Sequence, residues 1–253
     1  MMYELVFSAT GRTAKIADIL GGGFEGEKHR LDLSDPRMAA QAFEAEDFCI
    51  LTVSVYEGRV PKPAAENLKK LTGNGAKVLL AAVFGNRAVD DCLLEMQEIM
   101  VQQGFVPVAA IEAVAQHSIL TQVEPFRPDH ADRTELQTFT AQVAALREEN
   151  RTDYSLDLPG KMPYVEMGGI PLQPKGNRKC IGCGLCAQKC PMQAIPSDAP
   201  AQTDKTRCIT CMRCVELCPV HARDFHPLLQ KAAYLMMRSK MQGRKPNKLY
   251  LPK

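Results

Sequence analysis

Eight of the ten cysteines lie between Cys180 and Cys218, in two copies of one short motif. The sequence CIGCGLCAQKCP at residues 180–191 recurs as CITCMRCVELCP at residues 208–219, and every cysteine and the closing proline coincide at an offset of 28 residues. In the spacing C-x2-C-x2-C-x3-C-P, three thiols two residues apart can face one corner of an inorganic cluster, while the fourth is directed away. This repeat constrains the fold more than any other feature of the sequence.

The repeat predicts two [4Fe–4S] clusters, because the fourth cysteine of each copy reaches the cluster of the other copy. The expected ligand sets are Cys180, Cys183, Cys186 and Cys218 for one cluster, and Cys208, Cys211, Cys214 and Cys190 for the other. A zinc site usually offers two separated C-x2-C pairs, which leaves the third close cysteine and the proline unexplained. A disulfide framework suits exported proteins, and the sequence shows no export signal.

This part of the chain resembles the bacterial-type 2[4Fe–4S] ferredoxins over about 50 residues, 178–227. The resemblance implies a small α+β domain that passes single electrons. His221 and His226 follow the second motif, and we expect them to be caps or surface groups, since four thiolates already complete each cluster.

Charge is distributed unevenly over the 253 residues. The segment 228–253 carries seven Lys or Arg residues and no Asp or Glu, whereas the remaining 227 residues have a net charge of −5. We expect an apolar helix in this basic tail that packs Leu229, Leu235 and Met236 onto one of the domains; a site for acidic redox proteins is the alternative. We expect no nucleic-acid binding, because no recognised module accompanies the charge.

No apolar run is long enough to span a membrane; the best, Val78–Phe84, has seven residues. The first residues lead directly into a predicted strand without a secretory leader, so we expect a cytoplasmic protein. A chain of this length holds one large domain or two smaller ones.

Apolar runs and helical periodicity alternate along residues 1–150. The predicted strands are Tyr3–Phe7, Lys28–Leu33, Asp47–Val53, Lys77–Phe84 and Val106–Val114. The predicted helices are Arg12–Leu20, Met38–Ala45, Pro63–Leu71, one along Val89–Met100 and one along Leu136–Leu146. This alternation favours an α/β fold with a parallel sheet covered on both faces, in which Cys49 and Cys92 are expected as core residues.

In such a sheet, ligands bind beyond the carboxyl ends of the strands. Three loops leave the predicted sheet there: FSATGRT at 7–13, SVYEGRVP at 54–61 and GNRAVD at 85–90. Hydroxyl side chains and a glycine between a strand and a helix are a common cradle for phosphate, since the start of the helix offers unpaired N–H groups. The lysine of a nucleotide-triphosphate loop is missing, and plain helix capping is the alternative.

These loops resemble the phosphate loop and the two ring-flanking loops of flavodoxins, and the likeness covers residues 1–150. It implies a five-stranded parallel, doubly wound sheet with strand order 2-1-3-4-5, and bound FMN. The residues carried over are Ser8, Thr10, Gly11, Arg12 and Thr13 at the phosphate, Ser54, Tyr56 and Gly58 in the second loop, and Gly85, Asn86 and Arg87 at the pyrimidine edge of the ring. Tyr56 would stack on the ring, and Arg87 would stabilise negative charge on the reduced flavin.

Two positions depart from the flavodoxin pattern. Arg12 is basic in a loop that seldom uses a basic residue, so it would point to solvent or form an ion pair, and Val89 stands where an aromatic ring is common. A flavodoxin-like domain that binds no flavin and serves only for docking is the alternative. His117, after the last predicted strand, could approach the flavin, but we expect it at the surface.

A flavodoxin-like domain followed by a 2[4Fe–4S] ferredoxin resembles the flavodoxin–ferredoxin fusion family of anaerobic microbes. The predicted division is an FMN-binding domain at 1–150, a linker rich in Pro and Gly at 151–177, the ferredoxin domain at 178–227 and the basic tail at 228–253.

FMN exchanges electrons in pairs or singly and the clusters exchange them one at a time, so a chain with both converts between the two. We therefore expect an electron-transfer flavo-iron–sulfur protein that passes low-potential electrons between FMN and two [4Fe–4S] clusters, with redox proteins as partners. Two alternatives stay open: a flavin-dependent oxidoreductase acting on a small organic substrate or a quinone, and a ferredoxin with a flavin-free docking domain. The sequence leaves the donor, the acceptor and the oligomeric state open, and no nicotinamide site is expected.

Overall fold

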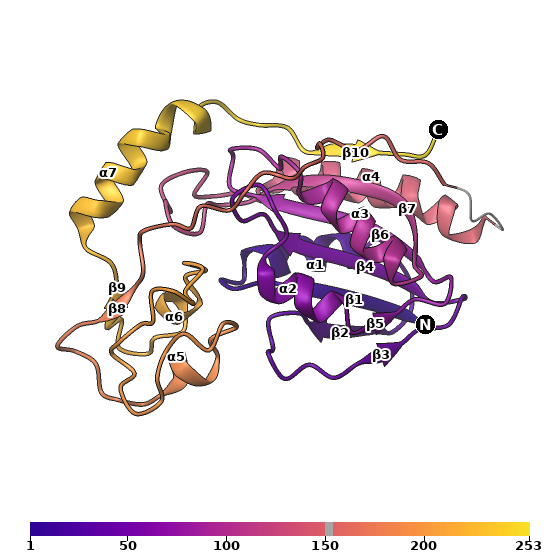
Figure 1. The fold of residues 1–253 in the computed structure, drawn as a ribbon. Helices are drawn as coiled ribbons and strands as arrows, with labels where there is room; N and C mark the ends of the chain where they lie inside the picture. Colours follow the sequence, from indigo (N-terminus) through magenta and orange to yellow (C-terminus); the bar gives the residue numbers. More distant parts are fainter. Residues whose placement is uncertain (150–153) are drawn as a thin grey trace.

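The computed structural model describes residues 1–149 and 154–253. The central sheet has five parallel strands: β1 (Met2–Phe7), β2 (Lys28–Asp32), β4 (Phe48–Ser54), β6 (Lys77–Phe84) and β7 (Val106–Val114). They lie in the order β2-β1-β4-β6-β7, which confirms the predicted order 2-1-3-4-5 of a flavodoxin-like sheet (Figure 1). Apart from the edge strand β2, these strands are mostly apolar and almost wholly buried, as expected of strands that are covered on both faces.

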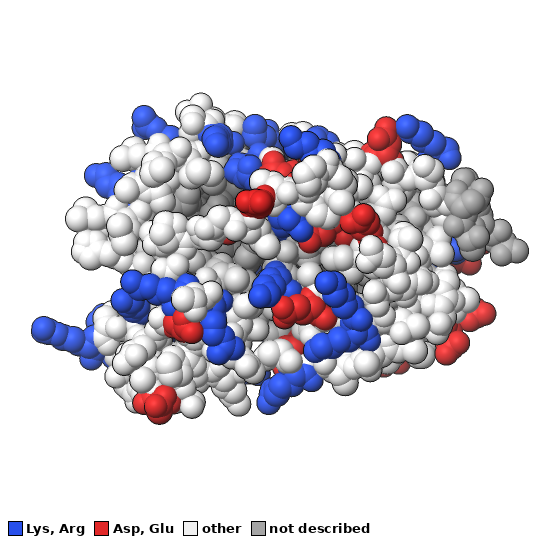
Figure 2. Space-filling view, in the orientation of Figure 1, with Lys and Arg blue, Asp and Glu red and all other residues white. Residues whose placement is uncertain are grey.

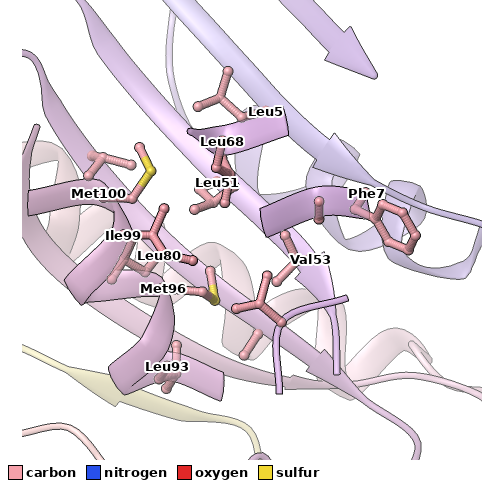
Figure 3. Close-up of a cluster of buried hydrophobic side chains, with 14 of the residues drawn as sticks. Leu5, Phe7, Leu51, Val53, Leu68, Leu80, Leu93, Met96, Ile99 and Met100 are labelled. Atoms are coloured by element: carbon pink, nitrogen blue, oxygen red, sulfur yellow. The ribbon is translucent and has the colours of Figure 1, made fainter. Parts of the chain in front are cut away.

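Helices cover both faces of the sheet (Figure 1). The helices α1 (Arg12–Gly21) and α4 (His130–Glu148) pack on one face, and α2 (Lys62–Leu68) and α3 (Cys92–Gln102) pack on the other. Figure 3 shows the second of these layers, in which Leu68 and Met96 belong to the same buried cluster as Leu51 of β4.

Both isolated cysteines belong to the core. Cys49 and Cys92 are fully buried, and burial raises the pKa of each thiol well above its usual value. Neither thiol has the lowered pKa of a reactive cysteine, so both act as small apolar residues.

The predicted helix at Met38–Ala45 is wrong. In its place, β3 (Gln41–Ala42) pairs in parallel with β5 (Leu71–Thr72), outside the central sheet. The N–H of Phe43 donates to the carbonyl of Thr72, and the Phe43 ring is fully buried in the core. Burial of this one ring, held by the strand pairing, outweighs the helix propensity of the alanines around it.

The segment GGGFEG at 21–26 has the glycine spacing of a dinucleotide-binding loop. The structure places it after α1, where it ends a helix, and not between a strand and the start of a helix. It therefore lacks the context that such a loop requires.

The eight clustered cysteines lie in a small second domain. A two-stranded antiparallel sheet of β8 (Lys175–Gly176) and β9 (Arg223–Asp224) joins its ends. Each cysteine motif contains one short helix, α5 (Leu185–Gln188) or α6 (Arg213–Glu216). In the part of the chain that the structure describes, no helix is both long and apolar enough to cross a membrane.

The C-terminal tail returns to the first domain. It forms α7 (Pro227–Met237), a 3-10 turn η1 (Arg238–Met241) and the strand β10 (Lys248–Tyr250), which pairs antiparallel with β7 as a sixth strand (Figure 1). The tail helix was predicted, but its packed residues were not. Leu229, Leu235 and Met236 are half or more exposed, whereas Tyr234, Met237 and Met241 pack inward.

The segment between the domains lies along the first domain. The carboxylate of Asp91 accepts the backbone N–H groups of Lys161, at 3.0 Å, and of Val165, at 2.7 Å. Arg59 donates to the carbonyl of Val165 at 2.9 Å. Residues 151–153 of the expected linker lie outside the described residues.

A third apolar cluster joins the two domains and the tail. Its buried members are Ile119, Leu120, Val123, Leu172, Met212, Phe225 and Met241. Ion pairs flank it: Arg12 with Glu216, at 3.3 Å, and Arg213 with Asp32, at 3.4 Å. The arginine of the phosphate-like loop thus forms an ion pair, one of the two positions expected for it, and the pair fixes α6 against the first domain.

Candidate functional site between the two domains

One cavity, here named the interdomain cavity, lies at the carboxyl ends of the parallel strands and has a volume of about 370 Å³. Seven of the predicted flavin residues line it: Arg12, Thr13, Ser54, Tyr56, Gly58, Gly85 and Arg87. This position is the one at which doubly wound sheets bind ligands, because strand order reverses there between β1 and β4.

The loop before α1 has the conformation of an anion cradle. Gly11 precedes the helix with a φ of 77°, which favours glycine, and the hydroxyl of Ser8 accepts the N–H of Ala14 at 3.0 Å. Among the described residues, no acceptor bonds the N–H groups of Thr10 and Gly11. Free N–H groups at the start of a ten-residue helix fit a phosphate.

The loop after β4 turns back sharply and places Tyr56 in the cavity wall. Tyr56 and Arg59 exchange backbone hydrogen bonds of 3.0 Å, and Glu57 and Gly58 between them have φ values of 52° and 84°. A Cβ on Gly58 would lie 2.5 Å from a carboxylate oxygen of Asp90, so the turn needs glycine to approach the third loop. The buried hydroxyl of Ser54 lacks a hydrogen-bond partner among the described residues.

The third loop divides its residues between the cavity and the tail. Arg87 lines the cavity and pairs with Asp90. Asn86 does not line it. Its side-chain amide donates to the carbonyls of Met241 and Gly243, at 2.8 Å each, and its carbonyl accepts the N–H of Lys245 at 3.1 Å. Val89 packs in the core, so the aromatic wall of this loop is indeed missing.

His117 stands in the cavity wall, so the expectation of a surface histidine is wrong. Its Nδ1 accepts the N–H groups of Ile119 and Leu120, both at 3.1 Å, which places the remaining proton on Nε2. Burial, together with the charges of Arg12 and Arg87, lowers the pKa of His117 to about 4. The imidazole is therefore a neutral donor at physiological pH.

The remaining walls come from outside the flavodoxin-like domain. Ile170, Pro171 and Leu172 of the connecting segment line the cavity. Ala233, Met237 and Met241 of the tail and Ile209 and Thr210 of the second domain complete the lining. A flat apolar ring bound here would lie between two domains and not at an open surface.

The cysteines of the second domain surround two further cavities. One is lined by Cys180, Cys183, Cys186 and Cys218, and the other by Cys190, Cys208, Cys211 and Cys214. Each set thus combines three cysteines of one motif with the last cysteine of the other. Within residues 1–149 and 154–253, no three His, Cys, Asp or Glu side chains are placed to bind one metal ion. A four-iron cube takes one thiolate at each of four corners, and each cavity is lined by four cysteines.

The interdomain cavity and the cavity of Cys190, Cys208, Cys211 and Cys214 share a wall. Ile209 lines both of them. The phenol of Tyr56 donates to the carbonyl of Cys211 at 3.5 Å, and burial raises the pKa of Tyr56 well above its usual value. The cavity of Cys180 and its partners lies beyond, where Cys183 and Ile181 are exposed.

Sequence reasoning missed part of this site. His117 was named as a residue that could approach the flavin but was expected at the surface, and its neighbour Gln116 was not named, although the rule that ligands bind at the carboxyl edge applies to both. Nothing in the sequence pattern pointed to Ile170, Met237 or Met241, because their positions depend on how the connecting segment and the tail cross the domain boundary.

The comparisons with known proteins match the two domains separately. Residues 179–222 match the sequence profile of the 4Fe-4S dicluster domain. A comparison with the curated proteins gave no match.

Solved structures similar to the first domain include flavodoxins. A flavodoxin from Streptococcus pneumoniae is 20% identical with a TM-score of 0.39, over 58% of this chain and 99% of that chain. Flavodoxin 2 from Bacillus cereus is 17% identical with a TM-score of 0.43, over 57% of this chain and 97% of that chain. Rubredoxin oxygen:oxidoreductase from Desulfovibrio gigas is 15% identical with a TM-score of 0.39, over 58% of this chain and 35% of that chain. The fold assignment rests on the strand order itself.

Proposed function

We propose that this chain, which joins a flavodoxin-like domain to a 4Fe–4S dicluster domain, transfers electrons between FMN and two [4Fe–4S] clusters. One observation carries the proposal: the cavity at the flavodoxin-like ligand edge and the cavity of Cys190, Cys208, Cys211 and Cys214 share Ile209 as a wall. Two redox groups in cavities that share a wall are placed to exchange electrons.

The residues of the interdomain cavity fit FMN. The loop 8–13 offers N–H groups to a phosphate, and the wall near Tyr56 offers an aromatic ring and the unpartnered hydroxyl of Ser54. Arg87 and the Nε2–H of His117 supply a positive charge and a neutral donor. FMN exchanges two electrons together or one at a time, while each cluster exchanges one, so the pair links two-electron to one-electron chemistry.

The two cysteine sets fit two clusters, which we name by position. The inner cluster would be held by Cys190, Cys208, Cys211 and Cys214, next to the interdomain cavity. The outer cluster would be held by Cys180, Cys183, Cys186 and Cys218, where Ile181 is 66% exposed. Electrons would leave or enter the protein at the outer cluster.

The surface around the outer cluster is basic, which supports a redox partner with an acidic surface. Residues 167–197 contain four Lys or Arg residues and no Asp or Glu. Six exposed basic residues of this domain form no ion pair among the described residues: Lys175, Arg178, Lys179, Lys189, Lys205 and Arg207. In Figure 2, blue side chains predominate over the lower left, where this domain lies. Opposite charge would bring such a partner to the outer cluster.

A second candidate function is reduction of a small organic substrate or a quinone at the flavin. One observation favours it: a second cavity, of about 890 Å³, adjoins the first and shares Glu57, Phe84, Arg87 and Ala88 with it. An oxidoreductase would bind its substrate there. In an electron carrier, solvent would fill that cavity.

The test starts with the composition of the anaerobically purified chain, for which we expect about eight iron atoms and one FMN. Freeze-quench EPR, after rapid mixing with a two-electron donor, then follows cluster reduction in the FMN-loaded protein and in the same protein stripped of FMN. We expect cluster reduction to be at least tenfold slower without FMN. Equal rates in both forms, or a chain that holds iron but refuses FMN, would overturn the proposal in favour of a flavin-free docking domain.

Tyr56 supplies a matched pair of variants for the same experiment. Tyr56→Phe keeps the ring and should bind FMN as the parent does, whereas Tyr56→Leu should bind it about two- to tenfold more weakly, because a stacked ring contributes about 0.5–1.5 kcal/mol. Fluorescence titration with FMN measures both. Equal affinities for the Phe and Leu variants would remove Tyr56 from the flavin site.

A further inference from the structure

The two halves of the cysteine domain differ in charge at one buried position. At the repeat offset of 28 residues, Ala194 matches Ala222, and the next residues are Ile195 in the first copy and Arg223 in the second. Both are buried, with exposed fractions of 6% for Ile195 and 2% for Arg223. Ile195 lines the inner cluster cavity, and Arg223 lines the outer one.

The guanidinium of Arg223 is surrounded by neutral acceptors. Its Nη2 donates to the carbonyls of Pro174, at 2.9 Å, and Gln202, at 3.3 Å, and to the hydroxyl of Thr203. Its Nη1 donates to the carbonyl of Pro200 and lies 3.8 Å from the sulfur of Cys186. Its Nε has no partner, and no carboxylate forms an ion pair with it, among the residues that the structure describes.

An arginine stays charged in proteins, and a buried charge without an opposite charge is strongly unfavourable. The negative charge that can balance Arg223 is that of the thiolate-bound clusters, and first that of the cluster whose cavity it lines, since Nη1 lies 3.8 Å from Cys186; the guanidinium also acts on Cys208 and Cys214 of the inner set. Reduction adds one electron to that cluster, and therefore strengthens its attraction to the guanidinium. Because the site is buried, this attraction is weakly screened.

We propose that Arg223 raises the reduction potential of the outer cluster above that of the inner cluster, whose cavity has Ile195 at the equivalent position. The charge of Arg223 would thus give the two clusters unequal reduction potentials, although their cysteine motifs are copies of one another. An electron that arrives at the inner cluster would then be held preferentially at the outer one, beside the basic surface. The inference rests on the two clusters and is independent of FMN.

The experiment is an EPR-monitored redox titration of the full chain with both clusters loaded. In the parent protein we expect two reduction steps whose equilibrium constants differ at least tenfold, which corresponds to 59 mV for one electron. Arg223→Ile copies the residue of the other half, and should lower the equilibrium constant of the higher-potential cluster at least tenfold with a smaller effect on the other. Ile195→Val is the matched control at the equivalent position and should leave both steps unchanged.

Two further variants distinguish the effect of the charge on the potentials from the effect of packing. Arg223→Lys keeps the charge and should retain most of the difference between the clusters, whereas Arg223→Gln removes the charge and should lose it. Parent clusters that titrate together, or Lys and Gln variants with equal potentials, would overturn the proposal. If the Ile variant fails to load its clusters, the titration of the parent protein still tests whether the two potentials differ. Its outcome does not depend on flavin binding, so a failure of this proposal is distinct from a failure of the proposed electron transfer to FMN.

Discussion

Single side chains determine the chemistry of the interdomain cavity. His117 is held by two backbone N–H groups on Nδ1, so its orientation and its tautomer are fixed before any ligand binds. Gly85 makes that position possible, because a Cβ on Gly85 would lie 2.7 Å from the imidazole Cδ2. The cavity therefore has one neutral, rigid donor, and its positive charge comes from Arg87 and Arg12.

The lowered pKa of His117 makes stability depend on pH. The folded-state pKa of about 4 lies below the ordinary value of 6.5, so the unfolded chain takes up the proton first as the pH falls. We expect the free energy of unfolding to drop by about 1–2 kcal/mol more in the parent than in His117→Asn between pH 7 and pH 5. Denaturant titration of the flavin-free, cluster-loaded protein at the two pH values measures this.

NMR of ¹³C-labelled histidine gives the direct control for that prediction. His117 should stay unprotonated at pH 5. A His117 signal that titrates near the ordinary pKa of 6.5 would contradict the burial argument.

The sequence was informative about residues whose role is local. Gly11 and Gly58 could be predicted because a tight loop demands a positive φ, and both have one. Asn86 could not be assigned in the same way. Its partners are the carbonyls of Met241 and Gly243, more than 150 residues away, and no local pattern encodes such a contact.

At the scale of elements, the tail acts as a strap over the cavity. The helix α7 and the turn η1 carry Met237 and Met241 into the lining, and β10 anchors the end on β7. Asn247 fixes that anchor: its carbonyl accepts the N–H of Val114 at 2.8 Å, and its amide donates to Asp132 at 3.0 Å. Asp132 is itself paired with the buried Arg127.

Loss of this anchor should loosen the strap. Asn247→Ala leaves the buried N–H of Val114 unpaired, which costs about 1–3 kcal/mol. We expect faster hydrogen exchange at residues 248–250 and a several-fold faster release of FMN. Lys253→Ala is the control, because its ion pair with Asp157 is exposed at both ends and should contribute little. Unchanged exchange and FMN release in Asn247→Ala would show that the strap is held elsewhere.

Elements with long apolar runs could be predicted from the sequence, and short elements could not. The strands β4, β6 and β7 follow from their own residues, since seven to nine consecutive positions are mostly apolar. The two-residue strands β3 and β5 form only because each finds the other across the chain. The three-residue β10 is polar at its first position and depends on the free edge of β7.

At the scale of the whole molecule, charge separates the two ends of the proposed electron path. The interdomain cavity takes its walls from both domains and the tail, while exposed basic residues lie in the segment that carries the first cysteine motif. Such an arrangement presents a surface that attracts an acidic partner at the cluster end.

Electron transfer to an external protein should therefore depend on salt and on the charge of the acceptor. We expect the rate with an acidic flavodoxin to fall as ionic strength rises, and the rate with basic cytochrome c to change in the opposite direction. The double variant Arg178→Glu, Lys179→Glu should slow the acidic acceptor at least tenfold at low salt. The double variant Lys62→Glu, Lys69→Glu, at exposed positions of α2 and at its end, changes the net charge by the same amount and is the control. A slowing as large in this control as in the variant of Arg178 and Lys179 would contradict docking at the outer cluster.

The return of β10 to the first domain places the cysteine domain inside a loop that begins and ends on one sheet. It is attached to the first domain at two points, and so it differs from a domain that moves on one flexible linker. During synthesis, all eight cysteines leave the ribosome before the sixth strand does. Delivery of iron and sulfide can thus precede the closing of the strap over the interdomain cavity.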